Sequence, residues 1–291
     1  MLAIGDIHRP IRRRYPRSAV GILHRTPAPP LSDFVALLWL YETDRPSHEK
    51  ELALPSGAAE LVVNLREDET RLYDAGDAER CMRLPGAVVC GPQSEYFVID
   101  TEEQIATAGV HFKAGGIFPF VEPPSHEIAE RHTALEDLWG RADARRLRLQ
   151  LLEAPTPEEK LDALERELLA RLRRGPERHP AVAHALGKFR RVPHLQTIAD
   201  VTREIGLSPR RFIEVFKEEV GLAPKAFCRV RRFQRVLTSI YERESVEWAD
   251  VAVACGYYDQ AHLIHDFRAF SGINPTAYME RRGRHRNHVA I

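Results

Sequence analysis

The sequence predicts an α+β fold class in two domains: an N-terminal β-barrel with flanking helices, and a C-terminal all-α domain with two helix-turn-helix units joined by a central helix. Two patterns support this prediction. Short runs rich in β-branched and aromatic residues continue to about residue 120, and helical periodicity replaces them beyond that point. The C-terminal half also contains an internal repeat. A length of 291 residues is suited to two domains.

Composition excludes several other classes of protein. The chain is 44% hydrophobic and 29% charged, which is ordinary for a soluble globular protein. Its longest apolar run, Phe34–Tyr41, is far shorter than the ~20 residues of a membrane helix, and no apolar segment follows the arginines at 12–14 as in a secretory signal. The cysteines form no CxxC pair, which favours a reducing, cytoplasmic environment; they are Cys81, Cys90, Cys228 and Cys255.

The formal net charge of zero conceals an uneven distribution. Residues 178–291 carry 19 Lys and Arg against 12 Asp and Glu, so the preceding residues are acidic by the same margin. We therefore expect only the C-terminal half to meet a polyanion.

The predicted N-terminal domain covers residues 1–175 and begins with strands. They are expected at Phe34–Tyr41, Glu60–Leu65, Ala87–Cys90, Tyr96–Ile99 and Gln104–Phe112, separated by turns rich in Gly and Pro. Thr156 and Glu159 form a capping box that predicts a helix over Pro157–Arg173. Its leucine stripe is either packed within its own chain or a dimer seam. We expect the domain boundary at Gly175–His179.

The internal repeat lies in residues 176–291, the predicted second domain. In the first copy its members are Ile198, Gly206, Phe216, Gly221, Pro224 and Phe227, and in the second they are Trp248, Gly256, Phe267, Gly272, Pro275 and Tyr278. The spacings between successive members are the same in the two copies, except that the second copy has one extra residue between Gly256 and Phe267. A helix, a glycine turn and a second helix with aromatic anchors describe a helix-turn-helix unit.

The second helix of each unit has a start signal and two distinct faces. Ser208 and Asp259 are good N-caps. The side chains expected to point outward are Arg210, Glu214 and Lys217 in the first unit, and Ala261, His262, His265 and Arg268 in the second. An amphipathic, basic helix over Lys225–Tyr241 spans roughly 25 Å. It can place two recognition helices about one duplex turn, ~34 Å, apart.

Thr197–Tyr278 resembles the DNA-binding domain of the AraC/XylS family of bacterial transcriptional regulators. The residues that carry the resemblance are Gly206–Ser208, Phe212, Phe216–Lys217, Gly221–Pro224, Arg231–Phe233, Ala252, Gly256–Tyr257, Phe267–Arg268 and Gly272–Pro275. The resemblance implies seven helices. It also implies base-reading roles for Arg210, Ile213, Glu214, Gln260, Ala261, His262 and His265. Ile213 and Ala261 offer only apolar contacts, as to a thymine methyl group. We expect phosphate contacts from Arg211, Lys217, Arg232 and Arg268.

The N-terminal half resembles the cupin-like sensor domains of some of these regulators. The residues that carry this likeness are Leu54–Gly57, Ala59–Val63 and Gly109–Phe112. Catalytic cupins hold a metal with a His-x-His pair, which this sequence lacks, so we expect neither a metal nor a cofactor. The candidate effector-pocket residues are Trp39, Tyr96, His111 and Phe112, for each of which core or wall packing is the alternative.

The expected function is that of a DNA-binding transcriptional regulator, activator or repressor, rather than an enzyme. Double-stranded promoter or operator DNA is the expected partner, and RNA polymerase, a small effector and a second copy of the chain are further candidates; a membrane is not. The expected location is the bacterial cytoplasm, with the nucleoid. Two alternatives remain: a cupin-type metal enzyme fused to a DNA-binding domain, and a purely dimerising N-terminal domain. A metal site of His262, His265 and Cys255 would lack a fourth ligand.

Overall fold

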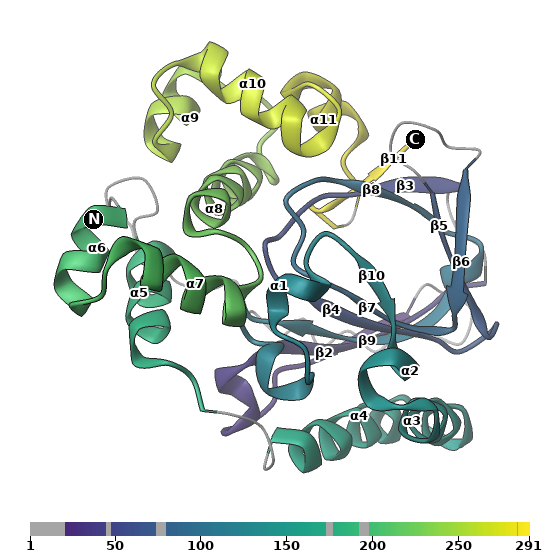
Figure 1. Ribbon diagram of the computed structural model, residues 1–291. Helices are drawn as coiled ribbons and strands as arrows, with labels where there is room; N and C mark the ends of the chain where they lie inside the picture. The colour runs from purple at the N-terminus through teal and green to yellow at the C-terminus, as the bar shows by residue number, and fades with distance from the viewer. Residues whose placement is uncertain (1–20, 45–47, 74–79, 173–176, 192–197, 284) are drawn as a thin grey trace.

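The computed structural model describes residues 21–44, 48–73, 80–172, 177–191, 198–283 and 285–291. Figure 1 shows two β-sheets on one side of the molecule and the helices of the C-terminal half on the other. Within the described ranges no helix combines the length and the apolar character that crossing a bilayer requires.

The larger sheet has six antiparallel strands in the order β1-β2-β9-β4-β7-β10. They are β1 (Gly21–Arg25), β2 (Val35–Glu42), β4 (Glu60–Asn64), β7 (Ala87–Cys90), β9 (Ala106–Phe112) and β10 (His132–Ala134). Short 3₁₀ turns at Leu31–Asp33 and Phe118–Phe120 flank this sheet.

The smaller sheet has five antiparallel strands in the order β11-β3-β8-β5-β6. They are β3 (Lys50–Ala53), β5 (Glu69–Tyr73), β6 (Cys81–Pro85), β8 (Phe97–Asp100) and β11 (His288–Ala290). The predicted closed barrel is therefore wrong in one respect, because these strands form two sheets that do not join. The chain passes between the two sheets several times, for example at Gly86 and at the 3₁₀ turn Glu103–Ile105, where it goes from the smaller sheet to the larger.

The five predicted strands lie within two residues of β2, β4, β7, β8 and β9. The pattern missed the other strands of the described chain. β5 and β6, for example, carry the charged residues Glu69, Arg71 and Arg83, although burial in β5 does alternate, with Thr70 and Leu72 buried. Their partners across the ladder, not their own sequences, make them strands.

One face of the larger sheet packs against a helical layer, which lies below the sheet in Figure 1. The layer consists of α2 (Leu135–Trp139), α3 (Arg141–Glu153) and α4 (Pro157–Leu172), whereas the short helix α1 (Ser125–Ile128) lies beside the C-terminal half. The predicted capping box starts α4, where the Glu159 N–H donates to Thr156 Oγ1 at 3.2 Å. Leu161, Leu164 and Leu168 are at most 1% exposed in this core, so the leucine stripe packs within its own chain.

The C-terminal half consists of helices around one apolar cluster. They are α5 (Pro180–Arg191), α6 (Ile198–Ile205), α7 (Pro209–Val220), α8 (Pro224–Ile240), α9 (Trp248–Cys255), α10 (Gln260–Ser271) and α11 (Pro275–Arg281). The central helix α8 buries Phe227, Val230 and Phe233 in this cluster.

The two halves share that apolar cluster. Leu52, Leu54 and Val98 of the smaller sheet belong to the same cluster as Phe227 and Val230 of α8. Hydrophobic burial thus contributes to holding the helices on the smaller sheet.

The C-terminal tail strengthens this connection, because β11 returns to the N-terminal half and pairs with β3 (Figure 1). The Leu54 N–H donates to the Asn287 carbonyl at 2.8 Å, and Val289 is fully buried. Gln234 of α8 donates to both the Pro55 carbonyl and the Asn287 side chain. Of the predicted boundary, Gly175 and Pro176 lie outside the described residues, and the domain limits remain a prediction.

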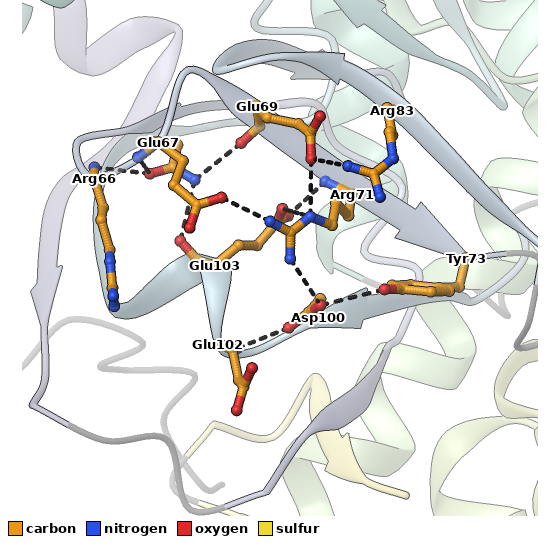
Figure 2. A network of polar contacts seen from close by, with 10 residues as sticks. Arg66, Glu67, Glu69, Arg71, Tyr73, Arg83, Asp100, Glu102 and Glu103 are labelled. Atoms are coloured by element: carbon orange, nitrogen blue, oxygen red, sulfur yellow. Dashed lines mark hydrogen bonds and ion pairs between the residues drawn. The ribbon is translucent and has the colours of Figure 1, made fainter.

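A polar network surrounds Arg71 at the far end of the smaller sheet (Figure 2). The Arg71 guanidinium lies 2.7 Å from Glu67, 2.9 Å from Glu69 and 3.5 Å from Asp100. The Glu103 side chain is fully buried beneath it and accepts from the Arg71 backbone N–H at 2.6 Å. Burial raises the pKa of Glu103 to about 7, although the Arg71 backbone hydrogen bond and the Arg71 charge act in the opposite direction.

Candidate nucleic-acid interface

The first helix-turn-helix unit consists of α6, a glycine turn and α7. Gly206 has a φ of +70°, a conformation that side chains with a Cβ rarely adopt, so the chain can turn sharply between the helices. Ser208 caps α7 by accepting from the Arg211 N–H at 3.3 Å, and Pro209 follows at the first helical position. Both start signals predicted from the sequence are therefore present.

Aromatic side chains fix α7 against the rest of the domain. Phe212 and Phe216 are fully buried with ring centroids 5.5 Å apart, and Phe216 also packs on Phe227 of α8 at 5.6 Å. The C-terminal end of α7 meets the N-terminal half, since a Cβ on Gly221 would lie 2.8 Å from Pro92. The outward face of α7, which includes Arg210, Ile213 and Glu218, nevertheless stays exposed and is available to an outside partner.

The predicted reading residues of α7 lie on that available face. The Arg210 side chain is 91% exposed, and Ile213 is also exposed. Glu214 lies 3.1 Å from Arg210 and 3.4 Å from Arg211. Hydrogen bonds from Arg210 and then Arg211 hold the pKa of Glu214 below its usual range, so Glu214 is an ionised acceptor flanked by two donors.

The second unit repeats this design with α9, a glycine turn and α10. Gly256 has a φ of +83°, and the Asp259 carboxylate accepts from the His262 N–H at 2.7 Å as the cap of α10. Leu263, Phe267 and Phe270 face the core with at most 4% exposure. The opposite face presents Gln260, Ala261, His265 and Arg268 to solvent.

His262 is oriented more tightly than its neighbours on α10. Its ring packs edge-on against Tyr257 at 5.1 Å, and its Nδ1 lies 3.4 Å from the Tyr258 backbone N–H. With Nδ1 accepting that hydrogen bond, the neutral ring carries its proton on Nε2, where it can donate. Gln260 and Arg268 also line a hollow of about 220 Å³ beside Trp248 and Pro275.

Arg232 differs from its predicted role as a phosphate contact. Its side chain is only 18% exposed, and its guanidinium lies 2.9 Å from Asp266 of α10. It also donates to the Gly256 carbonyl at 3.3 Å and lies over the Tyr257 ring at 4.3 Å. Arg232 therefore holds the second unit on α8 and is not free to bind DNA as the sequence predicted.

Arg229 of α8 contacts the other oxygen of the same carboxylate, at 2.7 Å. Burial alone would raise the pKa of Asp266, but hydrogen bonds from Arg229 and Arg232 outweigh it and hold that pKa below its usual value. The sequence offered one signal of this pairing: Asp266 stands between Leu263 and Phe270 on the core-facing side of α10. A carboxylate in an apolar stripe requires a partner.

The three residues that the sequence offered as zinc ligands, His262, His265 and Cys255, do not lie together around one point. Cys255 is 1% exposed and contacts the Ser239 hydroxyl, whereas His265 points to solvent. Among the residues that the structure describes, no group of His, Cys, Asp and Glu has an arrangement that would hold a metal ion.

Among the residues that the structure describes, the four predicted effector-pocket residues are not all brought together. Trp39 and His111 lie on the same face of the larger sheet, with ring centroids 5.9 Å apart. Strand alternation turns Phe112 to the opposite face, where it packs on Phe120. Tyr96 lies elsewhere, in contact with the end of α10 at Gly272.

The face that carries Trp39 and His111 is polar, a feature that the sequence analysis missed. His111 Nδ1 lies 3.1 Å from Glu60, its partner in the ladder between β4 and β9. On the other sheet, Glu51 accepts from His48 at 2.8 Å and from His288 of the C-terminal strand at 2.6 Å. These two histidines hold the pKa of Glu51 at about 2 in spite of its burial.

Comparison with known proteins agrees with this geometry. Residues 201–281 match the family described as "Helix-turn-helix domain", and residues 23–134 match the family described as "Domain of unknown function (DUF6597)". The chain is 33% identical over 90 residues to the HTH-type transcriptional regulator GadX of Escherichia coli strain CFT073. That match covers 31% of this chain and 32% of GadX, so the chain spans about a third of the curated relative it matches.

Two solved structures are also similar. A DNA-binding transcriptional dual regulator from E. coli K-12 is 27% identical, with a TM-score of 0.30, over 36% of this chain and 91% of its own. Fatty-acid-bound ToxT from Vibrio cholerae is 8% identical, with a TM-score of 0.44, over 92% and 96% of the two chains.

The two glycine-turn units and the family match define the C-terminal half as a helix-turn-helix domain. More particularly, this domain is of the AraC type, which confirms the resemblance seen in the sequence, and it is joined to an N-terminal domain of a second family.

Proposed function

We propose that the protein is a transcriptional regulator that binds double-stranded promoter DNA with α7 and α10 in two successive major grooves. The observation that carries the proposal is the pair of reading helices, both connected to α8 and both with exposed outward faces. A recognition helix enters the major groove with its N-terminal residues against the base edges. A regulator of this kind acts in the bacterial cytoplasm.

Base reading is assigned to the outward residues of the two helices. Arg210 suits guanine, Gln260 suits adenine, and Ile213 and Ala261 suit thymine methyl groups. Glu214 accepts a donor such as the cytosine amino group, while His262 and His265 offer ring nitrogens. Phosphate contacts are assigned to Arg211, Lys217 and Arg268, which flank the reading faces.

A selection of binding sites from genomic DNA with the purified full chain tests the proposal. We expect an enriched motif in two parts, with centres about 10 base pairs apart, because one duplex turn separates two grooves on the same face. Absence of any enriched motif would contradict sequence-specific binding. A single undivided motif would contradict the use of both helices.

The N-terminal domain is assigned the regulatory role, with an effector bound at the polar face that carries Trp39 and His111. A domain that serves only for dimerisation is the second candidate, because neither the Trp39–His111 ring contact nor the His111–Glu60 ion pair identifies a particular ligand. A thermal-shift screen against a metabolite panel separates the two, since an effector raises the melting temperature with concentration. Sedimentation of the same protein reports whether it forms a dimer.

Replacing Arg210 with alanine is expected to relax base preference at one or two positions of the selected site. The loss on the preferred sequence should be about 1–3 kcal/mol, with little change on random DNA. Arg203→Ala is the matched control, because Arg203 is an exposed, ion-paired arginine on α6 outside the reading helix. Equal losses on specific and random DNA would contradict the reading role of Arg210.

Replacing Lys217 with alanine is expected to weaken binding to all sequences alike. A lost phosphate contact lowers the steepness of the salt dependence of log K by about 0.9. Fluorescence anisotropy between 50 and 200 mM salt measures this slope. Lys113→Ala removes the same charge from an exposed site in the N-terminal domain and should leave the slope unchanged.

A further inference from the structure

Asp266 is a buried carboxylate on the second reading helix. Its side chain is 3% exposed, whereas His265 before it and Arg268 after it are exposed. Its two oxygens accept from Arg229 at 2.7 Å and from Arg232 at 2.9 Å. One carboxylate thus occupies two guanidinium groups that both come from α8.

The place of these arginines matters for a DNA-binding helix. A helix in the major groove is flanked by the phosphates of both strands. Both guanidinium groups end at Asp266 on α10: Arg232 lies over the Tyr257 ring, which His262 also contacts, and Arg229 lies over the Phe270 ring and remains 43% exposed. A guanidinium pairs with a phosphate in the same geometry as with a carboxylate, so the two anions compete for it.

We propose that Asp266 is an affinity-limiting residue of the DNA-binding surface, which withholds Arg229 from the DNA backbone and so limits affinity for DNA of any sequence. The inference rests on the proposed DNA-binding function. Phosphate contacts carry no sequence information and supply nearly all of nonspecific binding. An internal carboxylate that occupies a basic group beside a reading helix therefore lowers the phosphate-based part of the affinity for all sequences alike.

The exposed fractions indicate how large the effect is. Besides Asp266, Arg229 contacts only the Phe270 ring, at 5.2 Å, among the contacts that the structure describes, and nearly half of its side chain is already exposed, so it can turn toward solvent once the carboxylate is neutralised. Arg232 is held by the Gly256 carbonyl and the Tyr257 ring as well, and it stays in place. Loss of the Asp266 charge should therefore add about one phosphate contact, which changes the salt slope by ~0.9.

The test is Asp266→Asn in the full chain, titrated against a random-sequence 30-base-pair duplex between 50 and 200 mM salt. We expect tighter binding at 50 mM salt and a slope steeper by ~0.9, which is an extra loss of roughly threefold across this range. Asp250→Asn is the matched control, because Asp250 is an exposed carboxylate on α9 of the same unit. It changes the net charge equally without releasing an arginine.

Arg229→Gln gives a second readout, which as a single variant does not depend on how well Asp266→Asn folds. Alone it should leave the slope on random DNA unchanged, and combined with Asp266→Asn it should return the steeper slope to the wild-type value. A slope that falls by ~0.9 in Arg229→Gln alone would overturn the proposal, because Arg229 would then contact phosphate with Asp266 in place. Equal slopes for Asp266→Asn and Asp250→Asn would overturn it too. Failure of the wild-type chain to bind any duplex would instead remove the proposed function, and the role of Asp266 with it.

Discussion

Replacing Phe233 with alanine is expected to lower the free energy of unfolding by about 3–5 kcal/mol. The Phe233 side chain is fully buried, and its ring lies 5.2 Å from that of Phe267 and 5.1 Å from that of Phe270. The two partners belong to α10, whereas Phe233 belongs to α8. The substitution therefore leaves a cavity at the contact that holds the second reading helix on the central helix.

The loss should also affect DNA binding unevenly. A loosened α10 must be ordered again on binding, so affinity for the selected two-part site should fall more than affinity for random DNA. Urea denaturation measures the stability change. Ile213→Ala, at an exposed position of α7, should change the free energy of unfolding by no more than about 0.5 kcal/mol. A loss below 1 kcal/mol for Phe233→Ala would contradict the central place of this ring.

The second large effect concerns pH. Burial raises the pKa of Glu103 to about 7 from its ordinary 4.5, while the backbone N–H and the charge of Arg71 lower it and the charges of Asp100 and Glu67 raise it further. The folded protein therefore binds a proton at Glu103 that the unfolded chain has released between these two pH values. Stability from the neutral carboxyl is full below pH 4.5 and is lost as the pH rises through 7. The difference corresponds to about 3 kcal/mol.

Urea denaturation at pH 5 and pH 8 measures this effect. Between these pH values the wild-type chain should lose up to about 3 kcal/mol more than Glu103→Gln, because glutamine has the same shape and does not titrate. Glu102→Gln is the matched control, since Glu102 is the exposed neighbour in Figure 2 and should keep the wild-type pH dependence. If the free energy of unfolding changed equally between pH 5 and pH 8 in wild type and in Glu103→Gln, the role of this buried carboxyl would be contradicted.

Local signals in the sequence predicted the helical domain closely. Gly206 and Gly256 take the positive φ that the repeat implied, and Ser208 and Asp259 cap the reading helices. The outward residues of α7 and α10 follow from helical periodicity, because the apolar positions of each helix define its buried face. These features depend on residues within one or two helical turns of each other.

Contacts between distant segments were less predictable. Trp39 and His111 share one face of the larger sheet, but Tyr96 and Phe112 were expected beside them and lie elsewhere. The alternation within a strand shows which residues share a face, yet it does not show which face another element covers. The division into two sheets has the same origin, since it depends on where the pairing between strands stops.

The sequence by itself determined the duplicated helix-turn-helix unit, its caps, its turns and the outward faces of its reading helices. Only the tertiary structure decided that Arg232 pairs with Asp266, and that the C-terminal tail becomes β11 on the N-terminal sheet. The physical reason is the range of the interactions. Backbone conformation and helical periodicity are encoded by neighbouring residues, whereas an ion pair or a strand pairing depends on a partner that folding brings from elsewhere in the chain.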